Sequence, residues 1–205
     1  MELEQELLRA LELAAWDPNH ALGRVEAWPA GAARPSPPAT PEQVQASQRR
    51  LGFSLPVPLR QVVMQVANGG FGPGYGLLGL ESGATDDKGR TAVDTYLLWS
   101  SWHGQQDWRW PQRLLPICYW GCATYTCVIC EQGRVGGRLV RFDPNIEDEL
   151  QRFSGEGRTF AQWLRAWLDG QDLWPLEASE ADEEAELGWW QQRLGPPWGQ
   201  GRLFR

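Results

Sequence analysis

The stretch from residue 66 to residue 80, VANGGFGPGYGLLGL, places six glycines in fifteen positions and restricts the fold more than any other segment. Part of it, from Gly74 to Gly79, matches the G-x-G-x-x-G spacing of a dinucleotide-binding turn. That turn requires a strand before the glycines and a helix after them, so that the helix N-terminus faces the pyrophosphate. The flanking sequence therefore decides between a phosphate site and a connector.

Helix patterns come before the glycines. Residues 40–43, TPEQ, form a capping box with proline at the first helical position, and Gly52 is typical of a helix end. A second amphipathic pattern, which runs up to Asn68 and Gly69, comprises Leu59, Val62, Val63 and Val66. After Gly79 the sequence is turn-forming. We therefore predict a connector from helix to sheet whose glycines serve backbone geometry, and we expect no cofactor.

Beyond the glycines the pattern changes to strands joined by short glycine turns. We predict strands over residues 76–80, 93–97, 114–120, 124–131 and 138–142. Hairpin turns are expected at Gly133 and at Gly136–Gly137. A last amphipathic helix begins at Thr159 and ends at Gly170, with its apolar face formed by Phe160, Trp163, Leu164, Trp167 and Leu168. Helices, then antiparallel strands, then a helix predict an α+β fold.

The chain divides around this domain into four segments. Residues 1–27 are expected to form an N-terminal helical extension packed on the main domain, with one apolar face made of Leu3, Leu7, Leu8 and Leu11. Residues 28–39 are a proline- and alanine-rich linker, and residues 40–170 are the main domain. Residues 171–205 form an acidic and tryptophan-rich C-terminal tail.

The charge balance excludes some classes of partner. The net charge is −7, the isoelectric point is about 4.9, and Lys88 is the only lysine. Nucleic-acid binding needs clustered lysine and arginine, so we expect no nucleic-acid partner. An acidic surface suits a basic partner protein. The acidic N-terminus is unlike a secretory signal and no long apolar run is present, so we expect a cytoplasmic protein without a membrane partner.

Four cysteines lie within thirteen residues and raise the possibility of a zinc site: Cys118, Cys122, Cys127 and Cys130. Their spacing is irregular, and strand alternation would point Cys127 and Cys130 to opposite faces of a sheet. We favour reduced core cysteines, with a zinc site as the open alternative.

Catalytic motifs are missing from the sequence. It contains no G-x-S-x-G, Walker A or H-E-x-x-H pattern, and only two histidines, His20 and His103. An acid/base pair among loop aspartates remains open, the candidates being Asp86, Asp87, Asp94 and Asp143. Aspartates in loops more often serve turns, so we expect a protein that is not an enzyme.

Thirteen tryptophans are unusual for this length, and four of them, Trp99, Trp102, Trp108 and Trp110, lie close together in a polar stretch. Such a cluster could be an interface hot spot, a sugar-stacking platform or an edge of the core.

Several segments resemble the SUKH superfamily, which includes a fungal cell-wall-synthesis regulator and many bacterial toxin-immunity proteins. The residues that carry the resemblance are Leu51, Gly52, Leu55, Pro56, Asn68, Gly69, Gly70, Tyr75, Gly76, Trp120 and Gly121. With the helix after Thr159, the resemblance covers roughly residues 40–170. It implies a mostly antiparallel, mixed sheet flanked by helices and a non-catalytic role, in which many bacterial members neutralise a cognate toxin, often a nuclease.

From this resemblance and the acidic charge we expect a protein-binding domain that occludes a basic toxin domain. The candidate contact residues are Asp86, Asp87, Trp102, Asp107 and Trp108. Two alternatives stay open: a regulatory or scaffold protein that binds a host partner, and a carbohydrate-binding module that uses the tryptophan cluster.

Overall fold

The computed structural model describes residues 2–16, 34–101, 110–133, 136–147 and 152–174. In chain order its elements are α1 (Gln5–Trp16), α3 (Pro41–Leu51), α4 (Val57–Gln65), α5 (Ala92–Ser101), β1 (Leu114–Gly121), β2 (Thr124–Ile129), β3 (Arg138–Phe142), β4 (Phe153–Thr159) and α6 (Phe160–Leu168). The expected α+β class with a helix near the N-terminus is confirmed.

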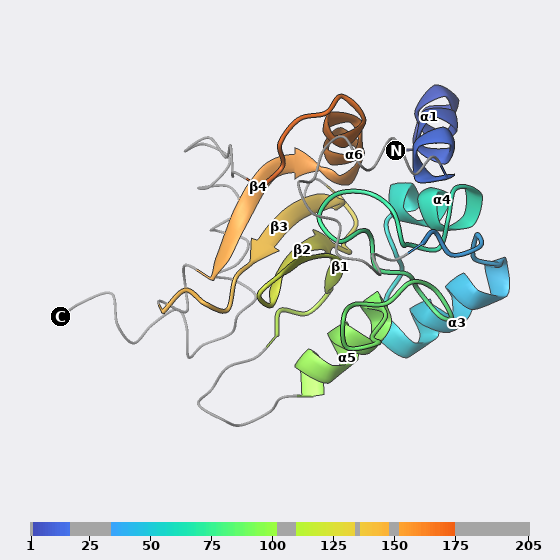
Figure 1. Cartoon of the computed structure of the whole chain (residues 1–205). Helices are drawn as coiled ribbons and strands as arrows, with labels where there is room; N and C mark the ends of the chain where they lie inside the picture. The colour runs from blue at the N-terminus through green and yellow to red at the C-terminus, as the bar shows by residue number, and fades with distance from the viewer. Residues whose placement is uncertain (1, 17–33, 102–109, 134–135, 148–151, 175–205) are drawn as a thin grey trace.

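The four strands in the described ranges form one sheet in the order β1-β2-β3-β4, and each neighbouring pair is antiparallel. Figure 1 shows α1, α3 and α4 gathered on one side of this sheet, with α6 at the β4 end and α5 at the β1 end. The glycine-rich connector follows the outer edge of β1. Its backbone makes one antiparallel bridge there, between Leu77 and Cys118, and Leu78 N donates to Ile117 O at 2.8 Å.

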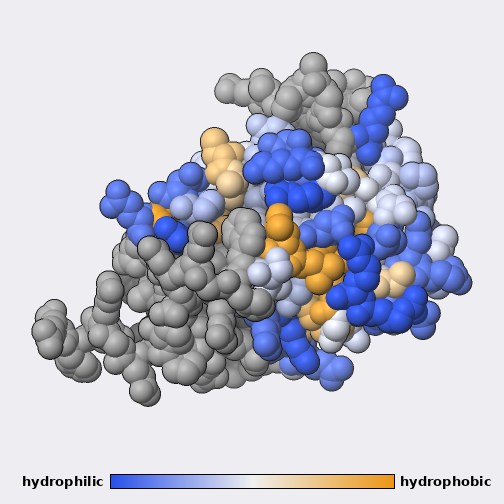
Figure 2. Space-filling model, turned by 90° about the horizontal axis from the view of Figure 1, so that it is seen from below, coloured by the Kyte–Doolittle hydropathy of each residue, from blue (hydrophilic) through white to orange (hydrophobic). Residues whose placement is uncertain are grey.

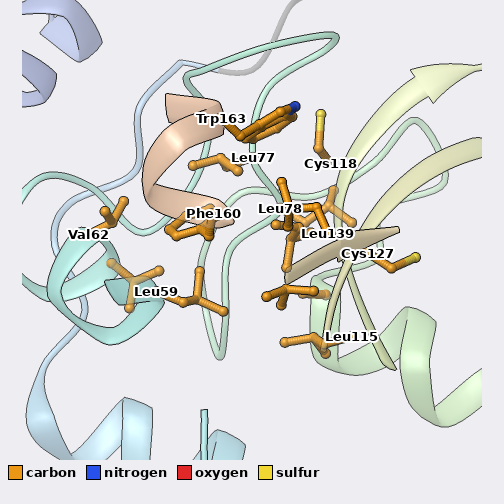
Figure 3. Close-up of a cluster of buried hydrophobic side chains, with 14 of the residues drawn as sticks. Leu59, Val62, Leu77, Leu78, Leu115, Cys118, Cys127, Leu139, Phe160 and Trp163 are labelled. Atoms are coloured by element: carbon orange, nitrogen blue, oxygen red, sulfur yellow. The ribbon is translucent and has the colours of Figure 1, made fainter. Parts of the chain in front are cut away.

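The helical side of the sheet holds an aliphatic core (Figure 3). Leu115 and Leu139 of the sheet face Phe160 and Trp163 of α6, and Leu78 of the connector lies between them. The side chains of these residues are almost fully buried. Removing this apolar area from water favours docking of the helices onto the sheet.

The opposite side of the sheet carries an aromatic cluster. Trp99 of α5 lies 4.4 Å from Trp110 and 4.9 Å from Tyr125, measured between ring centroids. Phe142 and Phe153 continue the cluster, with their ring centroids 5.0 Å apart. Edge-to-face and tilted arrangements at these distances are favourable for aromatic pairs. The core therefore lies on both faces of the sheet.

Capping boxes form as hydrogen-bonded pairs at the starts of α3 and α6. Thr40 accepts from Gln43 N at 3.3 Å and Gln43 accepts from Thr40 N at 2.8 Å, so α3 begins where the sequence predicts. Thr159 and Gln162 repeat this arrangement at the start of α6. Gly52 ends α3 in the left-handed conformation, with φ at 77°.

The predicted strand over residues 93–97 is wrong, because this segment lies in helix α5. Thr91 caps that helix: its hydroxyl donates to Asp94 Oδ2 at 2.7 Å, and Asp94 N donates back to Thr91 Oγ1 at 3.2 Å. A T-x-x-D capping pattern was therefore present in the sequence and was outweighed by the alternation of apolar residues. The carboxylate of Asp94 also pairs with Arg50 at 2.7 Å.

Two further strand predictions need correction. Residues 76–80 make a single bridge to β1 and are not a strand of the sheet. The sequence analysis also missed β4, whose residues FSGEGRT pair with β3. Two glycines give β4 a low intrinsic strand propensity, and pairing with β3 outweighs it.

Helix α1 packs against α4 and α6. Leu7, Leu8 and Leu11 of α1 are buried, and Leu3 N donates to Gln61 Oε1 of α4 at 2.7 Å. Trp16 Nε1 donates to Val66 O at 3.4 Å, which ties the end of α1 to the end of α4. Within the described ranges, no helix has the length and apolar character needed to cross a membrane.

Candidate functional site

Asn68 organises the end of the glycine-rich connector. Its side chain is buried; Nδ2 donates to Glu81 O at 3.1 Å, and Oδ1 accepts from Leu80 N at 2.8 Å. Its own carbonyl accepts from Ala84 N at 2.9 Å. One polar side chain thus supplies hydrogen-bond partners to backbone groups of a turn that lies outside regular secondary structure. Buried backbone groups require such partners.

The glycines beside Asn68 allow close approach of the backbone. Gly70 has φ at +83°, and a Cβ on it would lie 2.2 Å from Arg34 O. A Cβ on Gly69 would lie 2.5 Å from Gly79 N. No side chain fits at these distances, so the connector is packed against itself and against the segment before α3. The next described helix after Gly79 is α5, which begins at Ala92.

The connector carries Tyr75 to the edge of β1. Tyr75 N donates to Tyr119 O at 2.9 Å, and the two rings lie 5.5 Å apart. Tyr119 in turn lies 4.9 Å from Tyr125. Tyr75 is 40% exposed and Tyr125 is 1% exposed, so the three rings form a row from the surface to the core.

Asp86 lies at the inner end of this row, and its side chain has no exposed area. Its Oδ2 accepts from Arg90 Nη2 at 2.8 Å and from the Tyr125 hydroxyl at 3.0 Å. Burial alone would raise the pKa of Asp86, but the hydrogen bonds from Arg90 and from the backbone of Lys88 outweigh it, and the pKa is lowered. Burial and the negative Asp86 raise the pKa of Tyr125.

Asp87 lies at the outer end and is exposed. Its Oδ2 accepts from the Tyr119 hydroxyl at 3.2 Å. Burial and the charge of Asp87 raise the pKa of Tyr119. In the part of the chain that the structure describes, Asp87 pairs with no cationic side chain. We call Tyr75, Tyr119 and Asp87 the tyrosine rim.

A second polar cluster lies beside the β1–β2 hairpin, on the face of the sheet that packs against α6. Thr126 donates from its hydroxyl to Glu156 Oε1 at 2.5 Å, and Trp120 Nε1 donates to Thr126 Oγ1 at 2.8 Å. Arg141 lies 3.5 Å from that carboxylate, and its guanidinium carbon lies 4.9 and 5.3 Å from the ring centroids of Trp120 and Trp174. Burial raises the pKa of Glu156, and the charge of Arg141 offsets this in part.

Arg141 also holds the chain that follows α6. Its Nη2 donates to Leu173 O at 2.8 Å, and its Nη1 donates to the carbonyl of Trp174. A single buried guanidinium therefore joins β3 to the last described residues of the chain.

The candidate contact residues divide into three groups. Asp86 is committed to an internal ion pair, so its carboxylate is not on the surface. Asp87 is exposed. Trp102, Asp107 and Trp108 lie outside the described residues. Of the same tryptophan cluster, Trp99 and Trp110 are buried in the aromatic core and offer no sugar-stacking surface.

The residues that carried the family resemblance have structural places. Leu51 and Leu55 are buried, Pro56 precedes α4, and Gly76 has φ at +97°. Gly121 has φ at +94°, and a Cβ on it would lie 3.1 Å from the ring of Tyr75. Tyr75 was expected only as a motif residue and Tyr119 was not among the expected site residues, because strand alternation does not distinguish a partly buried tyrosine from its neighbours.

The cysteines divide between the core and the surface. Cys118, Cys127 and Cys130 are buried free thiols, whereas Cys122 is exposed in the β1–β2 turn. Burial raises the pKa of each of the three buried thiols. Among the residues with described positions, no three histidine, cysteine, aspartate or glutamate side chains are grouped as metal ligands.

The structure also has an open groove of about 470 Å³ between α3 and α4. Its described lining includes Gln45, Arg60 and Met64, and one carboxylate, Glu42. Figure 2 shows a small apolar patch on the face seen from below, bordered largely by hydrophilic residues. Neither feature presents a catalytic pair.

Together these features define an α+β domain in which helices flank an antiparallel sheet. A scan against protein-family models matches residues 38–169 to the SMI1/KNR4 family (SUKH-1). The match covers more than half of the chain, and the chain belongs to this family, which confirms the resemblance seen in the sequence. A search of curated proteins found no match. Family membership fits a non-catalytic immunity or regulatory domain that binds protein partners.

Proposed function

We propose that this protein is an immunity protein, which binds a cognate basic toxin domain and neutralises it by covering its functional surface. The observation that carries the proposal is the family match over residues 38–169. Nuclease toxins are one fitting class, because a surface that binds nucleic acid is rich in lysine and arginine.

Charge supports a basic partner. The chain has a net charge of −7, and opposite potentials accelerate and orient the encounter of two proteins. The tyrosine rim adds an exposed aromatic ring and an exposed carboxylate at one place on the surface. Tyrosine is enriched in protein interfaces, where its ring supplies contact area at low entropic cost.

The experiment is co-expression with candidate toxin domains, taken from genes that neighbour this one, followed by co-purification and an assay of toxin activity. We expect one toxin to co-purify in a stoichiometric complex and to lose its activity at equimolar concentration. A complex in which the toxin stays active would contradict neutralisation. If a host protein co-purifies and no toxin does, the protein is a regulatory member of the family instead.

Contact by Asp87, Trp102, Asp107 and Trp108 is part of the proposal. Asp86 contributes by holding the loop that bears Asp87, since its carboxylate accepts from Lys88 N at 2.9 Å and from Arg90 N at 2.9 Å. The role of Asp86 is thus to position the neighbouring acid rather than to meet the partner.

A further inference from the structure

We propose that the tyrosine rim is a binding site for an arginine side chain of the partner protein. The guanidinium would stack on the exposed ring of Tyr75 and pair with the carboxylate of Asp87. The inference deepens the proposed function, and it rests on that function only for the identity of the partner.

The geometry provides both halves of such a site. The ring of Tyr75 lies at 33° to that of Tyr119, which covers one side of it, and 40% of Tyr75 remains exposed. The Tyr119 hydroxyl donates to Asp87 Oδ2 at 3.2 Å, so the carboxylate is held at the Tyr119 end of the tilted ring pair. An aromatic face beside a carboxylate satisfies the flat, charged and hydrogen-bonding character of a guanidinium at once.

Two of the protein's own arginines are each paired with a carboxylate beside aromatic side chains. Arg90 is held by the carboxylate of Asp86, which also accepts from the Tyr125 hydroxyl at 3.0 Å. Asp87 and Tyr119 form a second carboxylate–phenol pair, nearer the surface than the pair of Asp86 and Tyr125. No arginine of the described residues pairs with the carboxylate of Asp87.

The second internal example is Arg141. Its guanidinium lies over the rings of Trp120 and Trp174 and 3.5 Å from the carboxylate of Glu156. Both examples combine a guanidinium, a carboxylate and aromatic side chains. The tyrosine rim has the carboxylate and the rings at the surface, where a partner can supply the missing cation.

Lys88 is the nearest cation along the chain and does not fill the site. Its side chain is exposed, and in the described parts of the chain it forms no ion pair. A lysine ammonium is also a compact, strongly hydrated charge that stacks less well on a ring than a guanidinium does.

The test is a titration of the full-length, ¹⁵N-labelled protein with the peptide acetyl-Gly-Arg-Gly-Arg-Gly-amide, followed by NMR. Matched peptides carry lysine or citrulline in place of both arginines. We expect the amide signals of Tyr75, Asp87 and Tyr119 to shift most, with the arginine peptide binding about 2- to 5-fold more tightly than the lysine peptide. The citrulline peptide, which keeps the planar group without the charge, is expected to cause no shift.

Three surface variants locate the binding. Asp87→Asn and Tyr75→Ala are each expected to lower the affinity for the arginine peptide by about 2- to 5-fold. Tyr75→Phe keeps the ring and is expected to retain the affinity. Glu12→Gln removes an equal charge from an exposed position on α1 and serves as the matched control.

Equal binding of the arginine and lysine peptides, or equal weakening by Glu12→Gln and Asp87→Asn, would overturn the arginine site. This titration contains no toxin, so its failure is separate from failure of the proposed function. Peptide binding at the rim without any toxin partner would leave the site standing and remove the immunity function.

Discussion

Asn68 supplies two side-chain hydrogen bonds to a backbone turn that has no regular secondary structure. Because its side chain is 1% exposed, water cannot replace those bonds when the amide is removed. The residue therefore connects the end of the helical part of the chain to the loop that leads into α5.

Asn68→Ala is expected to lower the free energy of unfolding by about 2–3 kcal/mol, since Leu80 N and Glu81 O lose their partners while buried. Urea denaturation followed by tryptophan fluorescence measures this. Asn145→Ala is the matched control, because Asn145 also bonds a backbone oxygen, that of Cys122 at 2.8 Å, but is exposed. Equal losses in the two variants would contradict the role of burial.

Asp86 makes stability depend on pH. Its pKa is lowered in the folded state, so its ion pair contributes stability that is present above the unfolded pKa of about 3.9 and is lost as the pH falls through the folded pKa. Asp86→Asn is expected to cost about 2 kcal/mol at pH 7 and to flatten the fall in stability between about pH 5 and pH 2. Urea midpoints measured across this range provide the readout.

The control for this prediction is the neighbouring carboxylate. Asp87 is exposed and accepts one hydrogen bond, from Tyr119. The variant Asp87→Asn is therefore expected to change the free energy of unfolding at pH 7 by less than about 1 kcal/mol. If the stability of Asp86→Asn falls with decreasing pH as steeply as that of the parent protein, other carboxylates cause the pH dependence.

At the scale of elements, α1 belongs to the same core as the domain that the family model covers. The helix contacts α4 and α6, and exposed Glu4, just before the helix, pairs with Arg165 of α6 at 3.5 Å. Family coverage begins at residue 38, so this helix is an addition to the family domain. Its buried leucines remove apolar area from water where α1 packs against α4 and α6.

Leu11→Ala is expected to cost about 3 kcal/mol, because Leu11 is 0% exposed and truncation leaves a cavity. Leu13→Ala makes the same change on the same helix at a side chain that is 75% exposed, and should cost less than about 0.5 kcal/mol. Both values come from urea denaturation. A small effect at Leu11 would mean that α1 docks weakly and that residues 1–27 act as a separate extension.

Elements were predictable from the sequence where local signals agreed. The capping box at Thr40 predicts the start of α3, and the apolar spacing after Thr159 predicts α6, each within a residue or two. Both signals act between residues that are close in the chain. Helix α5 was mistaken for a strand because its described residues are buried on more than one side, which blurs the helical period. The glycines of β4 hid a strand that only pairing with β3 stabilises.

For the whole molecule, net charge is the property that reaches furthest from the surface. The field of an acidic protein accelerates encounter with a basic partner, and added salt screens that effect. If the proposed toxin complex forms, its association rate should therefore fall as the ionic strength rises.

The double variant Asp87→Asn, Asp107→Asn is expected to slow association with the toxin by about 2- to 5-fold at low salt and to reduce its salt dependence. Glu2→Gln with Glu12→Gln removes the same two charges from exposed positions at the N-terminal helix. Stopped-flow or surface plasmon resonance at several salt concentrations compares them. An equal effect of both pairs would assign the steering to net charge, and no effect of either would contradict it.

The sequence by itself determined the fold class, the helix caps, the acidic charge and the family, because each depends on residue type and on spacing along the chain. The tertiary structure decided which of two adjacent aspartates faces the solvent. Asp86 turns inward to Arg90 and Tyr125, whereas Asp87 turns outward to Tyr119. The physical reason is that Tyr75, Tyr119 and Tyr125 come from a connector and two strands, and only packing of the connector along the edge of β1 stacks them beside the two acids.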